Sequence, residues 1–153
     1  MSKFLLLVED NPSDEKLTLR ALKKSGVPIE VSVVRDGAEA LDFLFAAGAY
    51  AQRDANELPA VVMLDLHLPR IDGLEVLRRV RANERTRCLP VVILTASKES
   101  EDIARGYALG ANAYVRKPVD FNEFIVAART LGVFWMLLNE PIPPNAECPG
   151  QHG

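Results

Sequence analysis

Residues 61–65 read Val-Val-Met-Leu-Asp, an apolar run that ends in a carboxylate. Three other apolar runs also lead into polar residues that can handle a phosphoryl group: residues 4–8 before Glu9-Asp10, residues 91–94 before Thr95, and residues 111–115 before Arg116-Lys117. Strands that are apolar throughout and alternate with helical patterns are typical of a parallel sheet covered on both faces. Ligands of such sheets bind beyond the carboxyl ends of the strands. The sequence therefore predicts an α/β fold in which three acids, a hydroxyl and an amine meet at one edge of the sheet.

The rest of the chain is expected to complete five strand–helix units. Strands are predicted at about residues 3–8, 30–34, 60–65, 90–94 and 112–116. Helix starts are marked by capping or first-turn residues, namely Asn11-Pro12, Asp36 with Glu39, Gly73, Ser100, and Asp120 with Glu123. The last helix is expected to extend to Leu138, and the polar segment 48–59 to form a loop or an extra helical turn.

Length and charge limit the possible functions. The 153 residues suggest one domain over 1–138, followed by a Pro- and Gly-rich tail at 139–153 that we expect to be flexible. The formal net charge of −3 and the lack of a basic stripe argue against nucleic acid as a partner. The apolar start is too short for a signal peptide, and no stretch is expected to span a membrane, so a cytoplasmic location is predicted. The tail is too short for an effector domain, so we expect the output to be a protein–protein contact or a phosphorelay step.

The acids suggest a metal-assisted phosphoryl site. Two of the charges on Glu9, Asp10 and Asp65 would repel each other by roughly 4 kcal/mol at 4 Å and an effective dielectric near 20, so a cation is expected among them. Oxygen ligands without His or Cys favour Mg²⁺. Thr95 can donate a hydrogen bond to a phosphoryl oxygen, and Lys117 can pair with another. Taken singly, each residue also has an ordinary structural explanation, such as a turn for Asp65, and it is their joint placement that favours the phosphoryl site.

Four segments resemble the receiver domain of a two-component response regulator of the chemotaxis-regulator-like type. They are Val-Glu-Asp-Asn at 8–11, Leu-Asp-Leu-His-Leu-Pro-Arg-Ile-Asp-Gly at 64–73, Leu-Thr-Ala at 94–96, and Tyr-Val-Arg-Lys-Pro at 114–118. The separations of 30 residues from Asp65 to Thr95 and 22 from Thr95 to Lys117 also match that family. The resemblance covers about residues 3–138. It implies a (βα)5 doubly wound, five-stranded parallel sheet with the flavodoxin-like strand order 2-1-3-4-5.

The same resemblance implies a phosphoacceptor and its metal ligands. Asp65 would accept the phosphoryl group. Asp10 and Asp65 would bind Mg²⁺ directly, together with the backbone carbonyl of His67, and Glu9 would act through a water molecule. His67 departs from the Asn or Met that is more usual at its position, which bears on the rate at which the phosphoryl group is lost.

The resemblance also assigns the switch. Thr95 and Lys117 would hold the phosphoryl oxygens, with Ala96 as the small residue beside them. Tyr114 would move inward when the Thr95 hydroxyl is drawn toward the phosphoryl group. The Lys117–Pro118 peptide bond is expected to be cis.

A narrower resemblance is to the stand-alone regulators that are paired with bacterial phytochromes. It rests on the Glu-Asp-Asn-Pro opening, the long segment before residue 60, and the Phe134-Trp135 ending. Regulators of that group often form dimers through the face made by the fourth helix, fifth strand and fifth helix. The expected dimer face comprises Phe121, Phe124, Phe134 and Trp135.

Three functions follow from these observations. The favoured one is a stand-alone phosphoacceptor switch loaded by a sensor histidine kinase, possessing at most self-catalysed phosphotransfer and dephosphorylation and so not an enzyme. The second is a phosphorylation-independent adaptor, which would not need the full set of site residues. The third is a haloacid-dehalogenase-type phosphatase, but that chemistry needs an Asp-x-Asp pair after the first strand, where this chain has Glu9-Asp10.

Overall fold

A five-stranded parallel sheet forms the centre of the molecule in the computed structural model, which describes residues 3–117 and 120–142. The strand order is β2-β1-β3-β4-β5, as predicted. The strands are Phe4–Val8 (β1), Glu30–Val34 (β2), Val61–Leu64 (β3), Val91–Thr95 (β4) and Ala113–Arg116 (β5). Val8 pairs with Leu64, and Leu64 pairs with Ile93. The carboxyl ends of β1, β3 and β4 therefore lie at one edge of the sheet.

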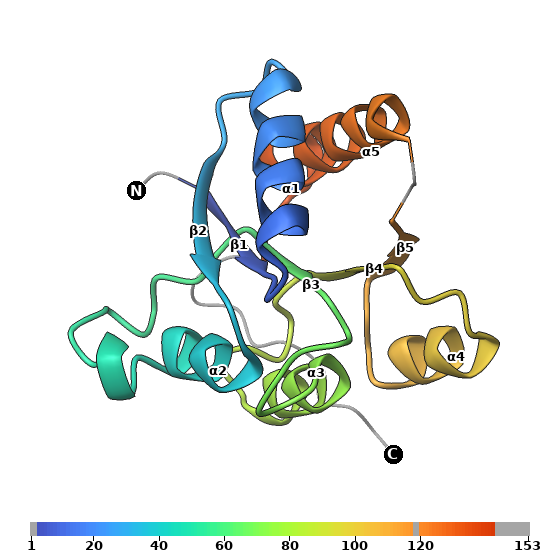
Figure 1. Cartoon of the computed structure of the whole chain (residues 1–153). Coiled ribbons are helices and arrows are strands. Elements are labelled where there is room, and N and C mark those ends of the chain that lie inside the picture. The colour runs from blue at the N-terminus through green and yellow to red at the C-terminus, as the bar shows by residue number, and fades with distance from the viewer. Residues whose placement is uncertain (1–2, 118–119, 143–153) are drawn as a thin grey trace.

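Helices cover both faces of the sheet. They are Pro12–Lys24 (α1), Gly37–Phe45 (α2), Gly73–Ala82 (α3), Ser100–Ala108 (α4) and Phe121–Val133 (α5). In Figure 1, α1 and α5 lie together on one side, and α2, α3 and α4 lie on the other. Alternate residues of β1 face the two sides, because Leu6 packs with Leu44 and Leu77 whereas Leu5 packs with Ala21 and Phe124. This alternation is the physical reason that the strands are apolar throughout.

The predicted helix caps are present in the structure. Asn11 accepts hydrogen bonds from the backbone N–H groups of Ser13 and Asp14, and Asp36 accepts one from Glu39. The capping box at α2 is altered, because the Glu39 carboxylate accepts from the backbone N–H of Arg35 instead of that of Asp36. At α3 the cap is Asp72, which accepts from Glu75. At α5 it is Asp120, which accepts from the backbone N–H of Asn122 instead of that of Glu123, so the predicted capping box is altered here too.

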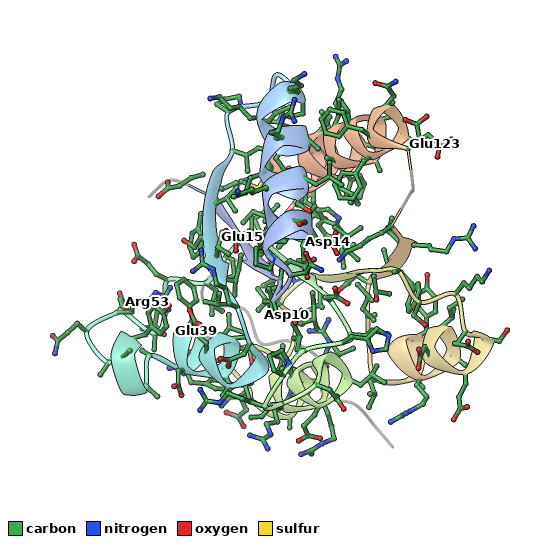
Figure 2. The ribbon with its side chains drawn as sticks, viewed as in Figure 1. Asp10, Asp14, Glu15, Glu39, Arg53 and Glu123 are labelled. Atoms are coloured by element: carbon green, nitrogen blue, oxygen red, sulfur yellow. The ribbon has the colours of Figure 1, made fainter. Side chains whose placement is uncertain are left out.

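The long segment after α2 contains one short 3-10 helix at Gly48–Tyr50. The Arg53 guanidinium lies 3.7 Å from the centre of the Phe43 ring. Arg53 also donates hydrogen bonds to the carbonyl oxygens of Phe43 and Glu57. One arginine, labelled in Figure 2, therefore ties this segment to the end of α2.

The C-terminal helix differs from expectation in two ways. After α5 the chain continues as a π-helix, Phe134–Leu138 (η2). The combined segment Phe121–Leu138 is 18 residues long and is apolar enough to cross a membrane by length and composition alone, which corrects the prediction that no such stretch exists. Core helices of globular proteins satisfy the same criteria, and here Phe124, Ala128 and Met136 pack into the core.

Two predictions fall on residues outside the described ranges. The isomer of the Lys117–Pro118 bond is one, because Pro118 is not described. The flexibility of the tail is the other, because the description ends at residue 142. Both stay predictions.

Candidate functional site

Three carboxylates gather beyond the ends of β1 and β3. Oxygen atoms of Glu9, Asp10 and Asp65 lie within 4.8 Å of one another. Glu9 and Asp65 are 2% and 7% exposed, whereas Asp10 faces solvent. Three acidic oxygen donors with one open side suit a hard divalent cation that keeps several water molecules. The donor set therefore fits Mg²⁺, and these three residues would hold it.

Lys117, directly after β5, supplies the positive charge of the site. Its Nζ donates to Glu9 Oε1 at 2.5 Å, to Asp65 Oδ2 at 2.9 Å and to Asp14 Oδ2 at 2.9 Å. An ammonium group has three N–H donors, so all three are in use. The side chain of Lys117 is only 8% exposed, and its stem therefore reaches the acids through the interior of the protein.

Burial and pairing alter the proton affinities of these groups. Burial raises the pKa of Glu9 to about 7, despite the opposing effect of Lys117. Burial would also raise the pKa of Asp65, but the hydrogen bond and charge of Lys117, with the donors of His67 and Thr95, more than offset it and lower the pKa. The pKa of Lys117 is raised, because its hydrogen bonds to Glu9, Asp65 and Asp14 outweigh its burial. Asp65 is thus held as a carboxylate beside a charged ammonium group.

The two oxygens of Asp65 have different partners. Oδ2 faces Lys117, whereas Oδ1 accepts from the Thr95 hydroxyl at 2.9 Å and from the backbone N–H of His67 at 3.2 Å. Thr95 is completely buried, and His67 is exposed. The main chain of His67 therefore borders the site while its side chain is turned to solvent.

Tyr114 lies on β5 next to α4. Its hydroxyl donates to the carbonyl oxygen of Ser97 at 3.0 Å. A methyl group added at Gly106 would lie 3.4 Å from Cδ2 of the Tyr114 ring, so α4 is in close contact with that ring. Ala96, between Thr95 and Ser97, is exposed. Thr95, which donates to Asp65, is thus only two residues before Ser97, which accepts from the Tyr114 hydroxyl.

The sequence reading missed two residues that shape the site. The predicted site does not include Asp14, although this residue lies in the first turn of the helix that follows Glu9 and Asp10. Figure 2 shows Asp10 and Asp14 together at the N-terminal end of α1. The sequence predicts Gly73 as a helix start and as the last residue of the resembling segment 64–73, but not its close approach to the site: a Cβ at this position would lie 2.2 Å from the carbonyl oxygen of Asp65. The first turn of a helix after an acidic strand end was the signal for Asp14, whereas nothing local signalled the close approach at Gly73.

The residues expected at a dimer face differ in how far they are exposed in the structure. Phe124 is 3% exposed and lies in the core, so the expectation that it would contribute to a surface was wrong. Phe121 is covered by the cations of Arg20 and Lys24 on α1. Phe134 is 47% exposed and meets Trp135 edge to face. Large exposed apolar residues on α5, η2 and the following segment are Val126, Phe134, Leu137, Leu138 and Ile142.

Comparison with known proteins agrees with this architecture. Residues 5–129 match the response regulator receiver domain family. The response regulator Rcp1 of Synechocystis is 34% identical over 134 residues, which cover 88% of this chain and 89% of Rcp1. A crystal structure of the Mn²⁺-bound form of Rcp1 covers 90% of this chain and is itself covered to 97%, with a TM-score of 0.81 and 33% identity.

Two further solved structures are regulators associated with phytochromes. The phosphorylated cyanobacterial phytochrome response regulator RcpA has a TM-score of 0.83 and 36% identity, with 92% of this chain and 98% of RcpA covered. The bacteriophytochrome response regulator AtBRR is 54% identical, with a TM-score of 0.73 and coverage of 92% of this chain and 99% of AtBRR. The order of the strands, the acidic cluster and these matches lead to one conclusion: the chain belongs to the response regulator receiver domain family.

Proposed function

We propose that this chain is a phosphoacceptor switch that takes a phosphoryl group on Asp65 from a sensor histidine kinase. The observation that carries the proposal is the surroundings of Asp65. Its carboxylate is kept ionised and accepts hydrogen bonds from the Thr95 hydroxyl and the Lys117 ammonium group. It also lies beside two further acids, Glu9 and Asp10. A carboxylate so placed is an activated nucleophile with its own charge-stabilising groups.

The transfer balances as a simple displacement. An oxygen of Asp65 attacks the phosphorus of a phosphohistidine, forming a P–O bond while the P–N bond breaks. The electron pair of that bond returns to the imidazole nitrogen of the kinase. Thr95 and Lys117 are placed to donate hydrogen bonds to the oxygens of the transferred group. When bound by Asp10, Asp65 and the His67 carbonyl, with Glu9 acting through water, Mg²⁺ would neutralise charge on those oxygens.

The proposed output is a change in a protein-binding surface rather than turnover of a substrate. The downstream partner is then a protein or a phosphotransfer domain, and water slowly removes the phosphoryl group. The connection from Thr95 through Ser97 to Tyr114 supports this view, because it links the acceptor to a ring that is in close contact with α4. We place this exchange in the cytoplasm, where kinases have access to ATP.

A bacterial phytochrome is the kinase that the relatives favour. RcpA and AtBRR are both described as phytochrome response regulators, and they cover over nine-tenths of this chain. The kinase choice rests on these relatives alone. A panel of autophosphorylated histidine kinases, with and without a phytochrome among them, tests it by the rate of phosphoryl transfer to the chain.

Asp65→Asn supplies the test of the acceptor itself. Wild-type protein with Mg²⁺ and beryllofluoride, a phosphoryl mimic, should show changed NMR shifts near Thr95 and Tyr114. Asp65→Asn should show none, and it should not be labelled by a phosphorylated kinase. A variant that responds like wild type would exclude Asp65 as the acceptor. A wild-type chain that shows neither response would favour a phosphorylation-independent adaptor.

We further propose that the chain forms a homodimer through α5 and η2 together with α4 and β5. Val126, Phe134, Leu137 and Leu138 expose large apolar side chains along one continuous helical segment, and α4 adds Tyr107, which is 52% exposed. Exposed apolar area concentrated on one element favours an interface. A symmetric pair would use this same surface on both chains.

A further inference from the structure

The contact between Asp14 and Lys117 has no part in the function proposed above. Asp14 lies in the first turn of α1, and its Oδ2 accepts from Lys117 Nζ at 2.9 Å. Its side chain is 40% exposed, whereas that of Lys117 is 8% exposed. The carboxylate therefore reaches inward from the rim of the site to a buried ammonium group.

Asp14 differs from the other two partners of Lys117 in one respect. Glu9 and Asp65 belong to the acidic cluster that fits a divalent cation, and Asp14 does not. A cation at that cluster would compete with Lys117 for the oxygens of Glu9 and Asp65. Its two positive charges would also repel the ammonium group a few ångströms away. Asp14 is the one partner that Lys117 could keep.

We propose that Asp14 is a positioning residue that retains Lys117 beside Asp65 while a divalent cation occupies the acidic cluster. The proposal rests on the function proposed above, because it concerns the same cation and the same amine. In the metal-free protein Lys117 is shared among three carboxylates. With the cation bound, it turns toward Asp14, so that its donors stay within reach of a phosphoryl group on Asp65.

The proposal makes a specific claim about cation affinity. Without the Asp14 carboxylate, Lys117 has only Glu9 and Asp65 to pair with, and the cation must displace it from both. Asp14→Asn should therefore weaken Mg²⁺ binding about fivefold, within the usual range of coupling between neighbouring charges. Calorimetric titration of the 153-residue chain with Mg²⁺ alone measures this, independently of any phosphoryl transfer.

Glu15 is the matched control for the loss of charge. It lies in the same turn of α1 but pairs with Arg35 at 2.9 Å, and Figure 2 shows Glu15 and Asp14 on different sides of the helix. Glu15→Gln removes the same charge near the same helix end. It should change the Mg²⁺ dissociation constant less than about twofold.

A double-mutant cycle separates positioning from simple attraction of the cation. Lys117→Met should itself tighten Mg²⁺ binding, because the competing ammonium is gone. In that background, Asp14→Asn should have less than about a twofold effect, since there is no amine left to position. If Asp14→Asn weakens binding equally with and without Lys117, Asp14 acts on the cation by charge alone and the proposal is wrong.

Further outcomes are equally decisive. The NMR shift of the Lys117 ε-carbon should move on Mg²⁺ addition in wild type and move differently in Asp14→Asn, and an identical change would overturn the proposal. Asp14→Ala, checked by cooperative thermal unfolding, repeats the test should the asparagine perturb the fold.

A wild-type chain that does not bind Mg²⁺ would overturn both proposals. A beryllofluoride response that survives in Asp65→Asn would overturn the proposed function alone.

Discussion

The Thr95 hydroxyl donates a 2.9 Å hydrogen bond to Oδ1 of Asp65, a residue 30 positions earlier in the chain. The two residues meet because β3 and β4 are neighbours and end at the same edge of the sheet. The hydroxyl thus already occupies the place from which it could meet a phosphoryl group on Asp65. The Tyr114 hydroxyl in turn donates to the carbonyl oxygen of Ser97. Thr95 and Tyr114, the two ends of the proposed switch, are therefore already close to one another when Asp65 carries no phosphoryl group.

Loss of the Thr95 hydroxyl should uncouple these two ends. In Thr95→Ala, beryllofluoride should still bind at Asp65, but about tenfold more weakly, because a hydrogen bond to a charged group contributes roughly 1.5 kcal/mol or more. The NMR shifts of Tyr114 should then no longer follow beryllofluoride binding. Thr95→Ser keeps the hydroxyl and should retain the coupling. A Tyr114 response of wild-type size in Thr95→Ala would show that the signal travels by another route.

The buried carboxyl of Glu9 should make the stability of the metal-free protein depend on pH. Its pKa is about 7 in the folded protein against an ordinary value of 4.5. Between these values the folded state binds more protons than the unfolded state, so stability falls as pH rises from about 4.5 to about 7. The loss should be about 3 kcal/mol, since one pKa unit corresponds to about 1.4 kcal/mol.

Urea unfolding at a series of pH values in the presence of EDTA measures this dependence. Glu9→Gln cannot titrate, so its stability curve should lack the fall between pH 4.5 and 7. A curve for Glu9→Gln that runs parallel to that of wild type would assign the dependence to another group.

Much of the site could be predicted because it depends on local pattern. Asp65 and Thr95 each end an apolar strand, and parallel strands bring their carboxyl ends to one edge. Lys117 could be placed in the same way, since it follows β5. The sequence reading could not find the partner of Lys117 on α1, because the rotation of a helix about its axis decides which first-turn side chain points to the site.

The fifth helix shows the opposite case. An apolar helix with several aromatic residues indicates burial on one face, but it does not tell which aromatic residue is on that face. Phe124 proved to be core and Phe134 surface. The change from α-helix to π-helix at Phe134 shifts the side chains that follow relative to a regular helix. The spacing of apolar residues in the sequence does not show where such a shift occurs.

Gly73 should be required at its position. A Cβ there would lie 2.2 Å from the carbonyl oxygen of Asp65 and 2.8 Å from Cα of Leu66. Gly73→Ala must displace this backbone, so it should lower the free energy of unfolding by about 2 kcal/mol or more. The displacement should also weaken beryllofluoride binding at Asp65.

Gly26→Ala is the comparison for Gly73→Ala. Gly26 has a φ of +81° with no atom within 4 Å of an added Cβ, so alanine should cost only about 1–2 kcal/mol of backbone strain and leave beryllofluoride binding unchanged. Chemical denaturation of both variants gives the two stabilities. If Gly73→Ala keeps wild-type stability and beryllofluoride binding, the backbone from Asp65 to Gly73 can shift to admit a Cβ at no cost, and the prediction is wrong.

Thr18 should be replaceable by valine with a gain in stability. Its hydroxyl is buried and finds no hydrogen-bond partner among the described residues. Thr18→Val removes an unsatisfied polar group, and the free energy of unfolding should rise by about 1 kcal/mol. Thr86 provides the contrast, since its buried hydroxyl donates to the carbonyl oxygen of Val80 at 2.6 Å. Thr86→Val should lower the stability by about 1 kcal/mol, and a gain there equal to that at Thr18 would contradict the argument.

The proposed dimer should depend on the exposed apolar residues of η2. Leu137 is 62% exposed, so a charge there is tolerated by the folded monomer but would be buried without a partner in a dimer. Leu137→Glu should therefore weaken dimerisation by a factor of about 30 or more, since an unpaired charge in an interface costs at least roughly 2 kcal/mol.

Trp135→Ala should also weaken the dimer, because it removes the ring against which Phe134 packs. Gln52→Glu adds a charge at an exposed position in the segment after the 3-10 helix, outside α4, β5, α5 and η2, and serves as the control. Sedimentation velocity at micromolar concentrations, with and without beryllofluoride, measures the assembly state. A wild-type chain that stays monomeric in both conditions would exclude the dimer, and a dimer that Leu137→Glu does not weaken would lie on another surface.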